Sequence, residues 1–284
     1  MSEIEKVGVI GAGTMGNGIA QACATAGLQV VMVDIADAAL RRGLSAINAS
    51  LDRLARKEKI AQADKDAALK RIDGTTDYGA LERCDLIIEA ATENEEVKQR
   101  ILREADGRAR SGVIIASNTS SISITALAAA TSRPAKFIGM HFFNPVPVMA
   151  LVELTRGLAT DDATVATAQA LVKALGKTAI VAKNSPGFVV NRILCPMVNE
   201  AVFALQEGLA SAADIDEAMK LGCGHQIGPL ALADLIGLDV MLAVMEVFYR
   251  DFNDPKYRPA LLLKEKVAAG HLGRKTGRGF FTYA

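Results

Sequence analysis

The chain has 284 residues, of which 50% are hydrophobic and 23% are charged. This length and composition are typical of a globular chain with a sizeable core, in one large domain or two. Its 32 basic residues balance its 32 acidic residues, so nothing in the charge favours a nucleic-acid partner. The charged N-terminus and the lack of any apolar run of about 18 residues predict a cytoplasmic protein without signal peptide or membrane partner.

The four cysteines show no C-x-x-C spacing and lie in apolar or helical contexts; they are Cys23, Cys84, Cys195 and Cys223. Buried, reduced thiols are therefore expected, which fits a reducing compartment. No metal site is expected.

A glycine pattern follows the first apolar segment, residues 7–10, which predicts a buried strand. Gly11, Gly13 and Gly16 occupy the G-x-G-x-x-G positions, and an apolar helix is predicted after them. In this pattern the first glycine permits a tight turn, and the second lets the backbone approach a pyrophosphate. The third lets the helix pack close to the strand, and the helix N-terminus offers free N–H groups to the phosphates. The predicted phosphate loop consists of Gly11, Ala12, Gly13, Thr14, Met15 and Gly16.

The second predicted strand, residues 30–33, ends at Asp34. A carboxylate at this position can accept hydrogen bonds from both ribose hydroxyls of NAD, and it repels the 2′-phosphate of NADP. An NAD site is predicted, because the strand, the glycine turn, the helix and the acid occur together.

Strand-like and helical segments alternate through the first two-thirds of the chain. The predicted strands are residues 7–10, 29–33, 85–90, 113–117, 136–141, 151–154 and 178–181, and the predicted helices are residues 15–26, 36–59, 95–109, 124–130 and 162–175. This alternation favours an α/β fold with a Rossmann-type doubly wound sheet. Residues 37–70 are long and charged for a crossover, which predicts a helical hairpin projecting from the sheet.

After residue 181 the apolar periodicity becomes helical, which predicts an all-helical C-terminal domain. The turn cluster Asn184-Ser185-Pro186-Gly187 places the boundary between domains of residues 1–185 and 186–284. Helices are predicted over residues 188–207, 212–221, 230–250 and 258–269, with Pro196 kinking the first. Gly208, Gly222 and Gly270 are predicted to cap helix ends.

Two residues are candidates for acid–base chemistry. His141 ends a predicted strand, and the carboxyl ends of strands line the ligand crevice of an open α/β sheet. Neutral imidazole can accept a hydroxyl proton, although a lone histidine can equally be a satisfied core residue. Glu153 lies in the apolar run 149–154, where a buried carboxylate needs a partner. It either holds the ring proton of His141, as the acid of a triad does, or faces solvent on an edge strand.

Three further polar groups each have two interpretations. The cluster Ser117-Asn118-Thr119-Ser120-Ser121 follows a predicted strand and is either a helix N-cap or a source of hydroxyls for a substrate. Asn191, in an apolar run, contacts backbone or faces a cleft between the domains. The basic residues of the predicted hairpin form a solvated face or bind phosphates such as those of coenzyme A; they are Arg53, Arg56, Lys57 and Lys59.

Five motifs occur in order along the whole chain: G-A-G-T-M-G, S-N-T-S-S, H-F-F-N-P-V-P, S-P-G-F-V-V-N-R and K-T-G-R-G-F-F. Together they resemble the L-3-hydroxyacyl-CoA dehydrogenase family, and within it the short monofunctional members. The resemblance implies reversible NAD-dependent oxidation of a (3S)-3-hydroxyacyl-CoA, such as 3-hydroxybutyryl-CoA, to the 3-oxoacyl-CoA. It implies that His141 is the acid/base and that Glu153 assists it.

The resemblance also assigns binding residues. It implies that Ser120 and Asn191 hydrogen-bond the substrate near the reacting oxygens, and that Ser50 and Lys57 bind the coenzyme A portion. The residues implied to contact NAD, besides the phosphate loop and Asp34, are Glu93, Lys98, Ser120, Asn144 and Lys275.

Two other functions remain open at this point. The first is a β-hydroxyacid dehydrogenase that acts on free acids, for which a lysine general base would be expected. The second is a crystallin-like relative that binds NAD without turnover. The presence of both His141 and Glu153 counts against a protein that binds NAD without turnover.

Residues 230–245 are apolar on nearly every side of a single predicted helix, which must then be covered on more than one face. A helical domain of roughly 100 residues has little core to cover it, so a homodimer through the C-terminal domain is expected. The resemblance implies the same. The alternative is that this helix is the centre of its own bundle.

Overall fold

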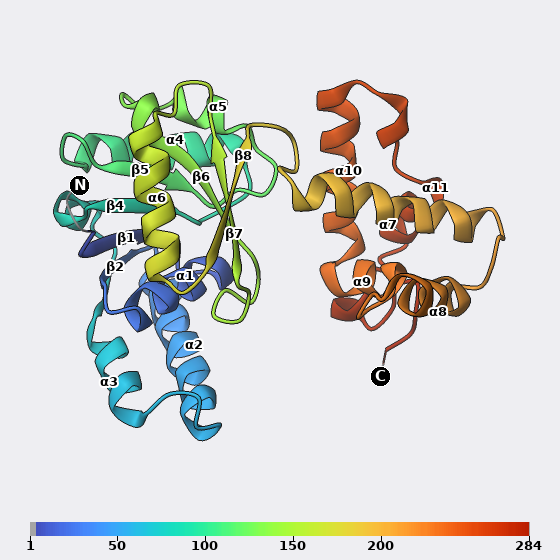
Figure 1. Ribbon diagram of the computed structural model, residues 1–284, viewed down its shortest axis with the longest axis horizontal. Coiled ribbons are helices and arrows are strands. Elements are labelled where there is room, and N and C mark those ends of the chain that lie inside the picture. The colour runs from blue at the N-terminus through green and yellow to red at the C-terminus, as the bar shows by residue number, and fades with distance from the viewer. Residues whose placement is uncertain (1–3, 284) are drawn as a thin grey trace. The chain divides into compact units, whose positions relative to one another are not determined.

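The computed structural model describes residues 4–283, which divide into two compact units, one ending at Ser185 and the other beginning at Pro186 (Figure 1). The first unit is a sheet with helices on both faces, and the second is built of helices. The predicted Rossmann-type α/β fold followed by a helical part is thereby confirmed.

Eight strands of the described chain form one sheet in the order β3-β2-β1-β4-β5-β6-β7-β8. Neighbouring strands are parallel except for the antiparallel pair β6 and β7. The strands are β1 (Lys6–Ile10), β2 (Gln29–Val33), β3 (Ile72–Thr75), β4 (Leu86–Glu89), β5 (Ile114–Ser117), β6 (Phe137–Phe142), β7 (Leu151–Arg156) and β8 (Thr178–Lys183). The carboxyl ends of β1, β2, β4, β5 and β6 therefore share one edge, where ligands bind in open α/β sheets.

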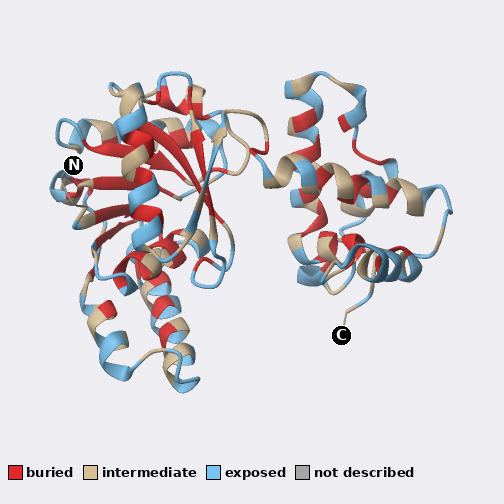
Figure 2. Ribbon diagram, viewed as in Figure 1, coloured by how far each residue is buried: buried red, intermediate tan, exposed pale blue. Residues whose placement is uncertain are grey.

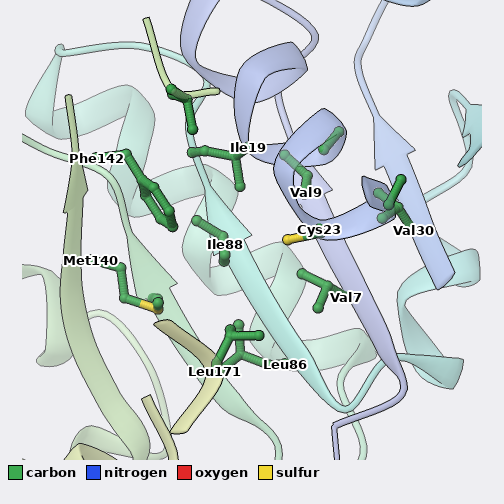
Figure 3. Close-up of a cluster of buried hydrophobic side chains, with 14 of the residues drawn as sticks. Val7, Val9, Ile19, Cys23, Val30, Leu86, Ile88, Met140, Phe142 and Leu171 are labelled. Atoms are coloured by element: carbon green, nitrogen blue, oxygen red, sulfur yellow. The ribbon is translucent and has the colours of Figure 1, made fainter. Parts of the chain in front are cut away.

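Side chains of the central strands alternate between two cores, as the two-residue period of a strand requires. Val7 and Val9 pack in one cluster with Cys23, whereas Ile10 belongs to a second cluster on the other face with Leu81. Figure 3 shows the first cluster, in which strand residues meet helix residues, and Figure 2 shows the central strands as buried. This double burial explains the nearly continuous apolar runs in the sequence.

The helices of the first unit are α1 (Thr14–Thr25), α2 (Asp37–Arg56), α3 (Gln62–Lys70), α4 (Glu95–Arg108), α5 (Ile124–Ala128) and α6 (Asp162–Ala174), with short 3₁₀ turns at Tyr78–Arg83 and Pro134–Lys136. α2 and α3 form the predicted hairpin, which projects from the sheet (Figure 1). Strand β3 was not predicted, because its sequence I-D-G-T has a single large apolar residue. It pairs along the edge of the sheet with β2, where polar residues are tolerated.

The helices of the second unit are α7 (Val190–Gln206), α8 (Ala212–Cys223), α9 (Pro229–Ile236), α10 (Leu238–Phe252) and α11 (Leu261–Ala268), with 3₁₀ turns at Pro255–Tyr257 and Arg274–Thr276. Pro196 lies inside α7, as predicted. Gly208 and Gly270 follow α7 and α11 at positive φ, but Gly222 lies within α8. The left-handed residue that ends α8 is Gly224, so the prediction for Gly222 is wrong by two residues.

The single helix predicted over residues 230–250 is wrong, because the chain breaks at Gly237. This glycine has φ +106°, outside the helical region, and separates α9 from α10. The amide of Leu238 donates to the carbonyl of Leu272 instead of continuing the ladder of α9. The two shorter helices bury residues such as Leu230 and Met245 in the core of their own unit. The two shorter helices thus bury part of their apolar surface within their own unit and leave part of it exposed.

Three of the four cysteines are buried, as predicted, and Cys223 is exposed, contrary to the prediction. Burial raises the pKa of the Cys23 and Cys195 thiols to about 12 and that of Cys84 to about 11. These three groups therefore remain protonated at neutral pH and are poor nucleophiles. Within residues 4–283, no helix is both long and apolar enough to cross a membrane.

Asp161 caps α6, and its removal provides a test of the first unit's stability. Its Oδ1 accepts a hydrogen bond from the amide of Thr164 at 2.6 Å. Hydrogen bonding from the side chain and the amide of Thr164, with help from Lys136, lowers the pKa of Asp161 to about 2. Asp161→Ala is expected to lower the free energy of unfolding by about 1 kcal/mol at neutral pH, measured by urea denaturation. Because the folded pKa lies below the unfolded value, this difference should vanish as the pH falls from about 4 towards 2.

Asp162→Ala is the matched control, because the neighbouring side chain is 91% exposed and makes a surface ion pair with Arg156. It should change the free energy of unfolding by no more than about 0.5 kcal/mol. Equal effects of the two substitutions would show that the cap does not stabilise α6.

Candidate active site

The glycine turn lies between β1 and α1, and its three glycines have different surroundings. Gly11 has φ +101°, and its amide donates to the carbonyl of Val33 at 2.7 Å. A Cβ on Gly16 would lie 1.8 Å from the carbonyl oxygen of Gly11, so the helix can pack here only without a side chain. A Cβ on Gly13 would meet nothing within 4 Å, so the space over the turn is open.

The N-terminus of α1 is free of the groups that usually satisfy a helix end. Its N-cap is Gly13, no side chain caps it, and its first turn contains no acidic residue. Ala12 is buried, Met15 is half-buried and Thr14 is exposed. Unsatisfied N–H groups and the positive end of the helix dipole therefore face an open space, which fits the pyrophosphate of a dinucleotide.

Asp34 lies directly after β2 and beside the glycine turn. One carboxylate oxygen accepts from the amide of Ala12 at 2.8 Å, and the other accepts from the amide of Ala36 at 3.3 Å. The carboxylate is half-buried and keeps lone pairs for further donors. This position suits ribose hydroxyls and disfavours an added phosphate, as the sequence predicts.

His141 and Glu153 lie directly opposite each other on the antiparallel strands β6 and β7. The Nδ1 of His141 is 2.7 Å from Oε2 of Glu153, and the two residues are 7% and 0% exposed. β7 lies between β6 and β8, so Glu153 is not on an edge strand facing solvent. An ionised carboxylate can only accept, which assigns the proton of the neutral ring to Nδ1 and leaves Nε2 as a base.

The polar loop after β5 is held by Glu93. Its Oε1 accepts from the Oγ1 of Thr119 at 2.7 Å, from the amide of Ser120 at 2.9 Å and from the Oγ of Ser120 at 3.0 Å. The structure thus brings together Glu93 and Ser120, two of the predicted NAD contacts. The N-cap of α5 is Ser123, whose Oγ accepts from the amide of Ala126, so Ser120 is not the capping residue.

Asn118 links this loop to the strand that carries His141, a contact that the sequence analysis did not predict. Its Oδ1 accepts from the backbone amide of Phe142 at 2.8 Å, and the backbone amide of Asn118 donates to the carbonyl of Glu89. The carboxyl ends of β4, β5 and β6 are thereby joined by hydrogen bonds. Asn144, two residues beyond β6, is exposed on the loop that leads to β7.

Lys98 has a different environment from the other predicted NAD contacts. Its side chain is 1% exposed, and its Nζ lies 2.6 Å from Oε2 of Glu89. Sequence reasoning missed Glu89, although an acidic residue in the apolar run 85–90 is the same signal that singled out Glu153. Glu89 ends β4, where it is paired in register with Ile10 just before the glycine turn and with Ser117 just before the polar loop.

The remaining predicted site residues lie on two other parts of the chain. Ser50 is half-buried on α2, and Lys57 is exposed at the end of that helix, in the projecting hairpin. In the second unit, Asn191 lies in the first turn of α7, and Lys275 makes an ion pair with Asp239 at 2.6 Å. Residues 4–283 contain no cluster of His, Cys, Asp and Glu side chains arranged to hold a metal ion.

The sheet order, the uncapped glycine turn and the acid at the end of β2 define a dinucleotide-binding oxidoreductase. The sequence model described as the 3-hydroxyacyl-CoA dehydrogenase NAD binding domain matches residues 6–185, and that of the C-terminal domain of the same enzymes matches residues 187–283. The chain belongs to the 3-hydroxyacyl-CoA dehydrogenase family, and its cofactor is NAD.

Relatives match the chain over nearly its whole length. A 3-hydroxybutyryl-CoA dehydrogenase from Bradyrhizobium diazoefficiens is 52% identical over 280 residues, which cover 99% of this chain and 96% of that protein. The crystal structure of an (S)-3-hydroxybutyryl-CoA dehydrogenase from Ralstonia eutropha has a TM-score of 0.98 and 67% identity, covering 99% of this chain and 100% of that one. A 3-hydroxybutyryl-CoA dehydrogenase structure from Escherichia coli has a TM-score of 0.96 and 41% identity, but this chain spans only 60% of it.

Proposed function

We propose that this chain catalyses the reversible NAD-dependent oxidation of a short-chain (3S)-3-hydroxyacyl-CoA, such as 3-hydroxybutyryl-CoA, to the 3-oxoacyl-CoA. The pairing of His141 with Glu153 carries the proposal, because it supplies an oriented base at the edge of the sheet that also holds the glycine turn. The names of the relatives that match the chain from end to end support the substrate class.

Proton transfer is the part of the reaction that these residues perform. Glu153 holds the Nδ1 proton of His141, so Nε2 is the ring nitrogen that accepts the proton of the substrate hydroxyl. The imidazolium that forms lies beside the carboxylate, which stabilises its positive charge. NAD held by the glycine turn and Asp34 would supply the acceptor for the hydride that leaves C3 of the substrate. In the reverse direction the imidazolium returns its proton to the oxygen of the 3-oxo group.

Binding roles follow from the same proposal. Ser120 hydrogen-bonds the substrate near its reacting oxygen, and Asn191 is proposed to do so as well. Ser50 and Lys57 on the projecting hairpin bind the coenzyme A portion, for which the exposed cations Arg53, Arg56 and Lys59 provide a positive surface. Glu93, Asn144 and Lys275 are proposed to contact NAD.

A spectrophotometric assay distinguishes this function from the two alternatives. Purified protein is mixed with NADH and either acetoacetyl-CoA or free acetoacetate, and NADH oxidation is followed. We expect rapid turnover of the thioester and little of the free acid. Preference for the free acid would favour a β-hydroxyacid dehydrogenase. NADH binding without turnover of either compound would favour the catalytically silent protein.

The carboxylate of Asp34 leads to a prediction about cofactor choice. NAD should exceed NADP in kcat/KM by at least about tenfold, because the carboxylate repels a 2′-phosphate. Initial rates with both cofactors, at saturating hydroxyacyl-CoA, measure the ratio. Asp34→Ala should reduce the ratio towards one. Equal efficiency of the two cofactors in the unaltered protein would show that Asp34 does not reach the ribose.

We also propose that the protein is a homodimer joined through residues 186–284. Several large apolar side chains of this unit are exposed within the single chain, including Leu221 on α8 at 80%, Leu235 on α9 at 53% and Val240 on α10 at 46%. Their burial against a second copy would remove apolar surface from water. Light scattering at micromolar concentration should give a dimer mass. A monomer mass with full activity would contradict the proposal.

A further inference from the structure

A buried ion pair lies next to the loop that carries Ser120, and the proposed mechanism does not use it. Glu89, the last residue of β4, is 0% exposed, as is Lys98 on α4. Their charged atoms are 2.6 Å apart. Removing two charges from water costs about as much as their attraction returns, so such a pair adds little net stability. Stability alone therefore does not explain this ion pair, whereas a role in the neighbouring site would.

The carboxylate of Glu89 is fixed from several directions. Oε2 accepts from the Oγ of Ser117 at 2.6 Å as well as from Lys98, and Oε1 accepts from the amide of Ala91 at 2.9 Å. These donors come from β5, α4 and the chain just beyond β4. Glu89 therefore has little freedom to move, and it holds the ammonium of Lys98 in one place.

The ammonium of Lys98 also reaches Glu93, whose Oε2 lies 3.8 Å away. The other oxygen of Glu93 accepts the hydrogen bonds of Thr119 and Ser120. Glu93 is 43% exposed, so its position depends on these contacts and not on packing alone. A continuous series of charged and hydrogen-bonded groups thus runs from Glu89, through Lys98 and Glu93, to the loop of Ser120.

We propose that Glu89 is a positioning residue, which acts through Lys98 and Glu93 to hold Ser120 in place for the substrate. This inference rests on the proposed function, in which Ser120 contacts the substrate. When Glu89 is ionised, it fixes the ammonium of Lys98 3.8 Å from Glu93, whose other oxygen holds the loop. Without that charge, Lys98 is no longer fixed in place, and Glu93 loses the cation that holds it beside the loop.

Amide hydrogen exchange tests the geometry separately from the function. The amide of Ser120 donates to Glu93, so its exchange in the cofactor-free protein reports whether the loop is held. In Glu89→Gln, which keeps the shape of the side chain, peptides covering residues 117–123 should exchange at least about tenfold faster. Acetoacetyl-CoA reduction should fall in kcat/KM by about tenfold or more.

The double variant Glu89→Gln with Lys98→Met separates positioning from stability. Replacing both members of a buried ion pair with neutral groups restores stability, because no unpaired charge remains. The melting temperature should therefore recover towards that of the unaltered protein. Exchange at the loop should remain fast and kcat/KM low, because Glu93 then has no cation beside it to hold it in place.

Asp106→Asn is the matched control. Asp106 is 11% exposed and pairs with Arg133, also in the first unit, and it is not among the proposed site residues. The substitution should lower the melting temperature, as Glu89→Gln does, while leaving loop exchange and kcat/KM within about twofold of the unaltered protein.

Two results would overturn the inference. One is unchanged exchange at residues 117–123 in Glu89→Gln. The other is that slow exchange, kcat/KM and the melting temperature all return to the values of the unaltered protein in the double variant. The ion pair would then contribute to stability alone. Failure of the unaltered protein to reduce acetoacetyl-CoA would instead reject the proposed function, while the exchange data would still decide whether Glu89 holds the loop.

Discussion

Glu153→Gln is expected to keep the fold and lower kcat by a factor of about 10² or more, because a neutral amide no longer stabilises the imidazolium. His141→Ala should be at least as damaging, since it removes the base itself. The two residues act as one unit, with Nδ1 and Oε2 2.7 Å apart. The double variant should therefore be little worse than the worse single variant. Steady-state reduction of acetoacetyl-CoA, with circular dichroism to check the fold, measures all three.

Thr155→Val provides the control for this experiment. Thr155 lies on the same strand as Glu153 and on the same face, it is fully buried, and its Oγ1 finds no hydrogen-bond partner among residues 4–283. Replacing its hydroxyl with a methyl group should leave kcat unchanged and should not lower stability. If the double variant loses kcat by the product of the two single factors, His141 and Glu153 act independently and the proposed partnership is wrong.

Gly16→Ala should have the largest effect on the cofactor-binding turn. The added Cβ would lie 1.8 Å from a backbone oxygen, which cannot move aside as the end of a flexible side chain can. α1 must then shift away from the turn, at a cost of about 3 kcal/mol in the free energy of unfolding. The phosphate-facing amides shift with it, so NADH binding should weaken by more than about tenfold. Urea denaturation and NADH fluorescence titration measure the two effects.

Gly13→Ala separates ligand binding from folding at the same turn. Gly13 has φ −67°, which alanine adopts readily, and its Cβ would enter open space. The free energy of unfolding should change by no more than about 1 kcal/mol, whereas NADH binding should weaken because the methyl group occupies the approach of the pyrophosphate. Binding as tight as in the unaltered protein would show that the pyrophosphate does not lie over Gly13.

Local patterns predicted most of the fold, because each depends on neighbours in the sequence. The doubly buried strands appear as apolar runs, and the turn glycines are spaced as the geometry of the turn requires. The break at Gly237 was missed, because a single glycine inside a strongly apolar stretch is compatible with a helix. The hydrogen bond from Leu238 to Leu272 that accompanies the break joins residues far apart in the chain.

The candidate site was predictable where a residue type was unusual for its surroundings. A carboxylate in an apolar strand singled out Glu153, and the antiparallel register of β6 and β7 supplied its partner. The same argument applied to Glu89 would have indicated a buried partner, but not which one. Lys98 lies in the amphipathic helix α4, and its sequence context does not distinguish a buried ammonium from a solvated one. Only the packing of α4 against the sheet places it beside Glu89.

We propose that the chain oxidises a (3S)-3-hydroxyacyl-CoA with His141 as the base. The most direct test measures the initial rate of NAD reduction with (3S)-3-hydroxybutyryl-CoA, (3R)-3-hydroxybutyryl-CoA and free (3S)-3-hydroxybutyrate, using the unaltered protein and His141→Ala. We expect turnover of the (3S)-thioester by the unaltered protein, little turnover of the other two compounds, and little turnover of any of them by the variant. Preference for the (3R)-thioester or the free acid, or an undiminished rate in His141→Ala, would contradict it.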